Sequence, residues 1–267
     1  MFLKKKRNGY IKGRGCAGGR PQRLYKTKEE TSSPTAATGS IFITLLLDVQ
    51  EGRDVTVVDI PGAFLQTMAS GNTIIKLQGA MVKMMLKVNL SWNEYAVLEG
   101  RKQVPTIYSE AIKALYGTVD AAKIFYDNLC NVLVKELGFV LNAYDACVSN
   151  KQVNGKQCTI IWHVDDLKIS HVDPNVVTQI IQELEKRFAE TISLSISRGK
   201  IHEYLGLIFD FTIQGATKIT MYQYIAGVIK HAGEIYKQGA GGATPAPNHL
   251  YEVRNPEFGE VELLPNK

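Results

Sequence analysis

Cysteine and long hydrophobic runs are both scarce in this sequence. Its 267 residues include four cysteines, which form no Cys-x-x-Cys pair: Cys16, Cys130, Cys147 and Cys158. This spacing argues against a zinc site or a disulfide framework and favours a reduced, intracellular protein, cytoplasmic or nuclear. The longest apolar run, Ile41–Leu47, is much shorter than the roughly 18 residues of a membrane span, and no apolar stretch follows the charged N-terminus. We therefore expect no membrane partner and no secretory signal.

Acidic side chains are absent from residues 1–28, which hold ten of the 31 lysines and arginines. The net charge is +5, and the remaining 239 residues carry 21 basic and 26 acidic side chains. The sequence therefore predicts a mildly acidic globule with a basic N-terminal arm. Such an arm favours a polyanion partner, either nucleic acid or nucleotide phosphate. A solvated leader is the alternative.

The pattern of apolar residues predicts an α+β fold, because helices and hairpins alternate without repeated strand–helix–strand units. Expected strands and hairpins are Val55–Ile60, Cys147–Ile161 around Asn154-Gly155, Thr159–Val164, Leu167–Val172, and Tyr204–Met221 around Gln214-Gly215. Expected helices cover Ile41–Leu47, a long segment from Ser109 to Leu137 interrupted near Gly117, a segment starting at Asp173-Pro174, and Tyr224–Ile229.

The segment Gly13–Gly18 matches the dinucleotide fingerprint G-x-G-x-x-G. That fingerprint needs a hydrophobic strand before it, a helix after it and an acidic residue about 20 positions further on. Here lysines precede it, and Thr38 stands at the acidic position. A nucleotide-binding oxidoreductase is therefore disfavoured, and a basic loop that approaches phosphate fits better.

Three carboxylates stand at the ends of predicted strands: Asp59 ends one strand, and Asp165-Asp166 separates two others. An exposed hairpin turn is the simpler interpretation of an Asp-Asp pair. The apolar residues on both sides, and the third carboxylate at another strand end, favour an oxygen-rich site for Mg²⁺. Two such ions can activate an attacking hydroxyl and stabilise a leaving pyrophosphate.

Six short segments occur in order along the chain: Lys12-Gly13-Arg14, Ser33-Pro34-Thr35-Ala36, Asp59–Leu65, Leu115-Tyr116-Gly117, His163-Val164-Asp165-Asp166 and Tyr204-Leu205-Gly206. Together they resemble the reverse transcriptase of copia-type LTR retrotransposons, from about Lys4 to about Lys230. The third segment is similar to the first catalytic motif of that family, Asp-x-x-x-Ala-Phe-Leu. The fifth is similar to its Tyr-Val-Asp-Asp box.

The resemblance implies a fingers–palm polymerase core, with an antiparallel palm sheet packed on helices. Residues 1–237 would form it, with the basic fingers arm at about 1–50, and residues 238–267 would be a poorly ordered tail. The function implied is RNA-directed DNA polymerisation, which adds dNMP to a primer on an RNA or DNA template. The chain is similar to one part of a longer Pol polyprotein, so we interpret it as a fragment or a degenerate copy.

The resemblance also implies roles for individual residues. Asp59, Asp165 and Asp166 would be catalytic and would hold two Mg²⁺ ions, or Mn²⁺ instead, with the Ile60 carbonyl as a further ligand. Phe64 would exclude the ribose 2′-hydroxyl and so select dNTP; a core phenylalanine is the alternative.

Further residues would bind the nucleotide and the primer. Lys12 and Arg14 would contact the triphosphate; a nonspecific contact with the nucleic-acid backbone is the alternative, above all for Lys12. His163 and the segment Tyr204, Leu205 and Gly206 would place the primer, or the segment would be an ordinary strand.

Several positions depart from the family pattern. Asp120 stands where the family has a glutamine near the incoming nucleotide, and an anion there would repel the triphosphate. His163 replaces the tyrosine of the Tyr-Val-Asp-Asp box, while Ala122 and Phe125 replace a proline and a tryptophan. The rival hypothesis is therefore a catalytically inactive, retroelement-derived domain that binds nucleic acid. The sequence leaves the oligomeric state open.

Overall fold

The fold is described from a computed structural model. It covers residues 2–5, 9, 11–71, 73–190, 192–233, 252–254 and 261–263. Contacts divide the chain into two units, residues 1–219 and 220–267, which are taken separately below. Within the described residues, no helix is long and apolar enough to cross a membrane.

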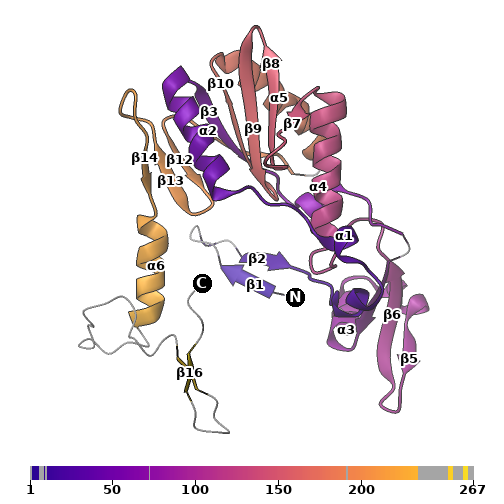
Figure 1. Cartoon of the computed structure of the whole chain (residues 1–267). Coiled ribbons are helices and arrows are strands. Elements are labelled where there is room, and N and C mark those ends of the chain that lie inside the picture. The colour runs from indigo at the N-terminus through magenta and orange to yellow at the C-terminus, as the bar shows by residue number, and fades with distance from the viewer. Residues whose placement is uncertain are drawn as a thin grey trace. The chain divides into compact units, whose positions relative to one another are not determined.

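A six-stranded sheet forms the centre of the first unit (Figure 1). Its order is β11 (Ser195–Arg198), β3 (Asp54–Asp59), β10 (Asp166–His171), β9 (Lys156–His163), β8 (Val148–Val153) and β7 (Val140–Leu141). Every neighbouring pair is antiparallel. The predicted α+β class with an antiparallel sheet is thus confirmed.

Helices cover both faces of this sheet because its central strands are apolar on both sides. One face packs on α4 (Ala121–Asn131), a π-helical turn (Val132–Glu136) and α5 (Pro174–Phe188). The other packs on α2 (Thr38–Glu51), β12 (Ile201–Tyr204) and β13 (Leu207–Asp210). Val58 of β3 contributes to the first core and Val57 to the second, as the alternation of a strand requires.

Local signals position α5 and α2 as expected. The Asp173 side chain accepts a hydrogen bond from the Asn175 N–H at 2.9 Å, and Pro174 opens α5. Such a cap contributes about 1 kcal/mol. Helix α2 ends at Gly52, whose φ of 62° is the left-handed conformation of a helix C-terminus.

The predicted helix starting at Ser109 is wrong. Ser109 lies in β6 (Val104–Glu110), which pairs with β4 (Ile74–Gln78) and β5 (Val97–Glu99) in a three-stranded sheet. Residues 111–120 then run as a loop in which Gly117 has a φ of 91°, so the helix starts only after Asp120. The apolar spacing from Ile112 to Val119 resembles a helical period without forming a helix, whereas the predicted helical part after Asp120 is confirmed by α4 and the π-helical turn.

The other elements of the first unit are short. They are β1 (Phe2–Lys5), β2 (Ile11–Arg14), η1 (Arg20–Leu24), α1 (Lys28–Thr31), η2 (Ala63–Gln66), α3 (Ala80–Val88) and η3 (Leu90–Tyr95). Strand β14 (Lys218–Thr220) pairs beside β13 and reaches the boundary of the two units.

The second unit contains α6 (Tyr222–Gly233) and a small hairpin of β15 (Glu252–Arg254) and β16 (Val261–Leu263). The helix confirms the prediction for Tyr224–Ile229. Most of the predicted tail, residues 238–267, lies outside the described residues.

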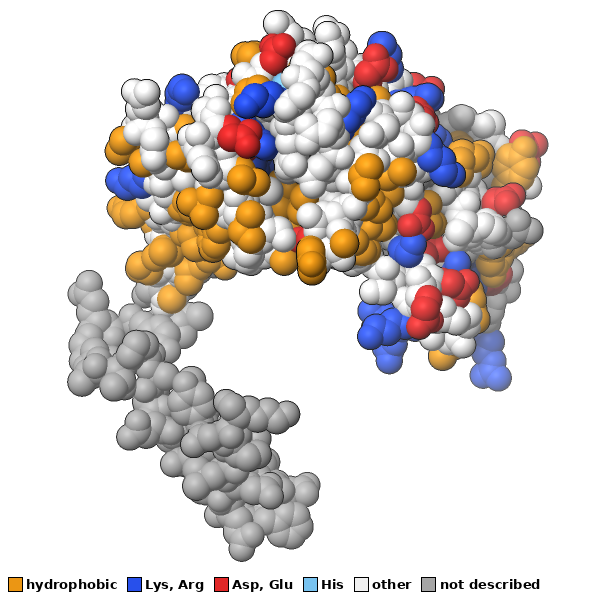
Figure 2. All heavy atoms as spheres, turned by 45° about the horizontal axis from the view of Figure 1, so that its top comes forward, with side chains coloured by type: hydrophobic (Ala, Val, Ile, Leu, Met, Phe, Trp, Pro, Cys, Tyr) orange, Lys and Arg blue, Asp and Glu red, His pale blue; other side chains and the backbone are white. Residues whose placement is uncertain are grey.

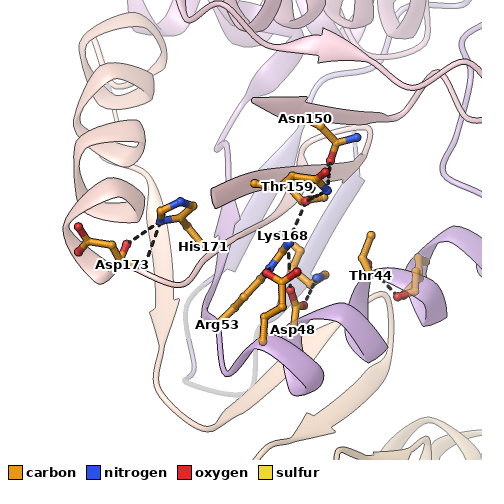
Figure 3. A network of polar contacts seen from close by, with 11 residues as sticks. Thr44, Asp48, Arg53, Asn150, Thr159, Lys168, His171 and Asp173 are labelled. Carbon is orange, nitrogen blue, oxygen red and sulfur yellow. Dashed lines mark hydrogen bonds and ion pairs between the residues drawn. The ribbon is translucent and has the colours of Figure 1, made fainter. Parts of the chain in front are cut away.

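A buried ion pair fastens α2 to the sheet (Figure 3). The Lys168 ammonium of β10 donates to the Asp48 carboxylate of α2, and both side chains are almost wholly buried. Arg53 lies 4.0 Å from the other Asp48 oxygen and donates to the Thr159 hydroxyl at 2.9 Å. Burial lowers the pKa of Lys168, and the Asp48 carboxylate opposes that shift. These charges therefore stabilise each other without any external ion.

The outer surface of α2 is apolar. Phe42, Ile43 and Leu46 are all exposed on it. On the face drawn in Figure 2, hydrophobic side chains gather along the lower edge of the central part, while charged side chains are scattered above them and at the lower right.

Candidate active site

The three predicted carboxylates meet at one end of the central sheet. Asp59 is the last residue of β3 and Asp166 the first of β10, and the two are directly paired across the strands. Asp165 is the second residue of the two-residue turn that joins β9 to β10, and Asp166 follows it. The sequence therefore predicted their convergence correctly.

The turn itself differs from the prediction. Val164 and Asp165 form it, whereas Asp166 pairs with His163 inside the ladder. Val164 has a φ of 58°, a conformation that is strained for a β-branched residue. Ile60, fully buried below the turn, donates its N–H to the Asp165 carbonyl at 3.0 Å. This bond ties the end of β3 to the turn.

Like charges dominate the electrostatics here. Burial, together with the negative charges of Asp165 and Asp59, raises the pKa of Asp166 to about 6. A carboxylate surrounded in this way is stabilised by a nearby cation.

The donor set has the chemistry that Mg²⁺ prefers, several carboxylate oxygens with room for phosphate and water. As placed, however, the three side chains do not form a ligand set: among the described residues, no group of three or more His, Cys, Asp or Glu side chains is arranged to hold a metal ion. The strand ends bring Asp59, Asp165 and Asp166 together, and gathering their oxygens would require side-chain adjustment.

Phe64 lies in η2, five residues after Asp59. Its ring packs on Tyr116 with centroids 4.7 Å apart and on Phe125 at 6.4 Å. Phe64 is half-buried and borders the core under the sheet. The Phe64 ring therefore contacts the core on one side and is partly exposed on the other. Its contact with the Tyr116 ring could not be predicted from the sequence.

The basic arm is anchored to the loop before α4. Backbone N–H groups of Ala17 and Gly19 donate to the Tyr116 and Gly117 carbonyls at 2.7 and 3.0 Å. The crossing is so close that a Cβ on Gly117 would lie 2.1 Å from the Ala17 oxygen. Gly19 and Gly117 are thus needed for a backbone approach. This part of the arm is not a solvated leader.

Lys12 and Arg14 lie on β2, where they pair with Lys4 and Phe2 of β1. Their side chains are outside the described part of the structure, so their contact with a triphosphate stays a prediction. The segment Gly13–Gly18 leads from β2 toward the short helical turn η1, which is not the strand–helix context of a dinucleotide site.

Asp120 does not present a free anion. Its side chain is 4% exposed, the Lys26 ammonium lies 3.0 Å away, and the Ser70 hydroxyl donates to the same oxygen. Burial alone would raise the pKa of Asp120, but the hydrogen bonds from Ser70 and Lys26 and the positive charge of Lys26 outweigh it and lower the pKa. This compensation cannot be predicted from the sequence, in which Lys26 is one of ten basic residues of the arm.

Tyr204 is buried, and its hydroxyl donates to the Asp166 carbonyl at 3.4 Å. Leu205 and Gly206, both with positive φ, form the turn between β12 and β13. The segment is therefore a hairpin turn under the carboxylates, not one continuous strand. His163 is half-buried beside Asp166. Primer placement by these four residues stays a prediction.

Comparison with known proteins decides the family. A profile described as "Reverse transcriptase (RNA-dependent DNA polymerase)" matches residues 1–245. The chain belongs to this reverse transcriptase family. The predicted recognition is thus confirmed.

A curated relative of this reverse transcriptase chain is the retrovirus-related Pol polyprotein from transposon RE1 of Arabidopsis thaliana. The two are 25% identical over 196 residues, which is 73% of this chain but 12% of the polyprotein. The chain thus spans a small part of that relative's length.

Two solved telomerases are also similar. The Candida albicans enzyme, in complex with a fragment of telomeric RNA, has 10% identity and a TM-score of 0.40, covering 80% of this chain and 41% of that one. The Candida tropicalis apo enzyme has 10% identity and a TM-score of 0.37, covering 74% and 43%.

Proposed function

We propose that this chain catalyses RNA-directed DNA synthesis, adding dNMP to a primer 3′-hydroxyl and releasing pyrophosphate. The observation that carries the proposal is the direct pairing of Asp59 with Asp166, with Asp165 in the adjoining turn. Family membership supports the reaction class.

In this proposal, Asp59, Asp165 and Asp166 hold two Mg²⁺ ions, or Mn²⁺, together with the Ile60 carbonyl. When bound, such ions would supply a lower pKa at the primer hydroxyl and charge neutralisation at the triphosphate. The chain itself contributes position: the Ile60–Asp165 hydrogen bond and the β3–β10 ladder hold together the backbone segments that carry the three carboxylates. Template, primer and dNTP are the proposed partners.

Other side chains border the proposed reaction. Phe64, held against Tyr116, would fill the space of a ribose 2′-hydroxyl. Lys12 and Arg14 would bind the triphosphate, and His163 with Tyr204, Leu205 and Gly206 would support the primer end. Because Asp120 is neutralised by Lys26, the expected repulsion of the triphosphate is weakened.

Primer extension tests the proposal. On poly(rA)/oligo(dT) with Mg²⁺ and dTTP, we expect the wild-type chain to incorporate dTMP and Asp165→Asn to lose roughly a thousandfold in rate, since metal stabilisation of the reacting groups contributes several kcal/mol. The matched control is Asp127→Asn, an exposed carboxylate on α4. Should the wild type bind primer–template in a gel shift but never extend it, the chain is the inactive binding domain.

A further inference from the structure

The contact between the arm and the loop before α4 is a continuous series. Here we call residues 17–26 the anchor segment. Along it, Ala17 and Gly19 bond to Tyr116 and Gly117, and the Val119 N–H donates to the Gln22 side-chain oxygen at 3.0 Å. The Lys26–Asp120 ion pair closes the series at the start of α4. The contacts therefore follow the same order along both segments, from Ala17 with Tyr116 to Lys26 with Asp120.

The ion pair includes a third segment. The Lys26 ammonium donates to the Ser70 hydroxyl at 3.0 Å, and that hydroxyl donates onward to Asp120. Ser70 follows η2, which carries Phe64. One buried polar cluster therefore joins the anchor segment, the chain after Phe64 and the loop that carries Tyr116.

Burial gives this cluster its strength. The side chains of Lys26 and Asp120 are 16% and 4% exposed, so water screens their attraction weakly. Removing one partner leaves a buried, uncompensated charge, whereas removing both charges leaves none. Loss of either charge alone should therefore loosen the three segments, whereas loss of both charges should loosen them much less.

The cluster lies next to the proposed nucleotide site. Tyr116 lies in the loop held by the anchor segment, and its ring packs on Phe64 at 4.7 Å. Phe64 lies in the short helix that follows Asp59. A shift of the anchor segment would be passed to Tyr116, then to Phe64 at the edge of the carboxylate end.

We propose that Lys26 is a positioning residue: through Ser70 and Asp120 it locks the anchor segment onto residues 116–120 and thereby fixes the Tyr116–Phe64 wall against which dNTP binds. The dNTP part rests on the proposed function. The lock itself does not, because it is a contact within the free protein.

Hydrogen exchange and kinetics test the two parts separately, with Lys26→Met, Asp120→Asn, the double variant and Lys26→Arg. Amide exchange at Ala17, Gly19 and Val119 should accelerate more than about tenfold in Lys26→Met, because truncating one partner of a buried pair leaves the other unpaired. Lys26→Arg and the double variant should recover most of the protection. The control is Lys28→Met, which removes an exposed arm charge two residues away.

Kinetically, Lys26→Met should raise KM for dTTP about tenfold with a smaller change in kcat, whereas a purely structural role would lower the active fraction, hence kcat, and leave KM unchanged. Unchanged exchange in Lys26→Met, or a double variant that shows the sum of both single effects, would overturn the lock. If exchange responds but KM does not, the link to dNTP is wrong. If no variant or wild-type protein extends a primer, the proposed function fails while the exchange result still decides the lock.

Discussion

Two charged clusters on neighbouring positions of the same strand behave in opposite ways. Lys168 of β10 is buried against Asp48 of α2, with Arg53 nearby, so opposite charges balance within the chain. Two residues earlier on the strand, Asp166 faces Asp59 and adjoins Asp165, so like charges meet. The first cluster is complete in the free protein, whereas we propose that an added cation stabilises the second. That contrast distinguishes a structural ion pair from a candidate metal site.

The largest effect should follow from breaking the balanced cluster. Lys168→Met leaves the Asp48 carboxylate buried without its ammonium partner, which should lower the free energy of unfolding by about 3–5 kcal/mol. Urea denaturation measures this change. The double variant Lys168→Met/Asp48→Leu should return close to wild type, and a double variant as unstable as the single one would contradict the account.

A smaller effect of opposite sign is expected two residues away. With divalent metal removed by EDTA at pH 8, Asp166→Asn should raise the free energy of unfolding by about 1–2 kcal/mol, because a pKa of about 6 means that ionising Asp166 costs the folded state energy. A carboxyl whose pKa is raised on folding destabilises the protein as pH rises from its unfolded pKa toward its folded pKa. The gain should therefore shrink at pH 4. A variant less stable than wild type at pH 8 would show that the like-charge interaction is not dominant.

Sequence reasoning located the carboxylates but not the charges that balance elsewhere. Runs of β-branched residues indicate where strands end, so the sequence predicts that Asp59 and the Asp165-Asp166 pair lie at strand ends close to each other. The turn at Val164 could not be predicted, since valine is not a residue that indicates a positive φ. Lys26 and Lys168 also escaped, because a lysine reveals its partner only when the fold brings a distant carboxylate beside it. The apolar spacing predicts helix in the loop before α4, because the contact of Gly117 with the arm joins residues about a hundred positions apart and leaves no local signal.

Thermal unfolding with and without Mg²⁺ tests the central claim most directly. Binding to the folded state alone raises the midpoint by mass action. The account predicts that excess Mg²⁺ raises the Tm of the wild type and leaves that of Asp166→Asn nearly unchanged, so that the advantage of the variant in EDTA is reduced. An equal rise in both proteins, or no rise in the wild type, would contradict the claim that these three carboxylates form a cation site.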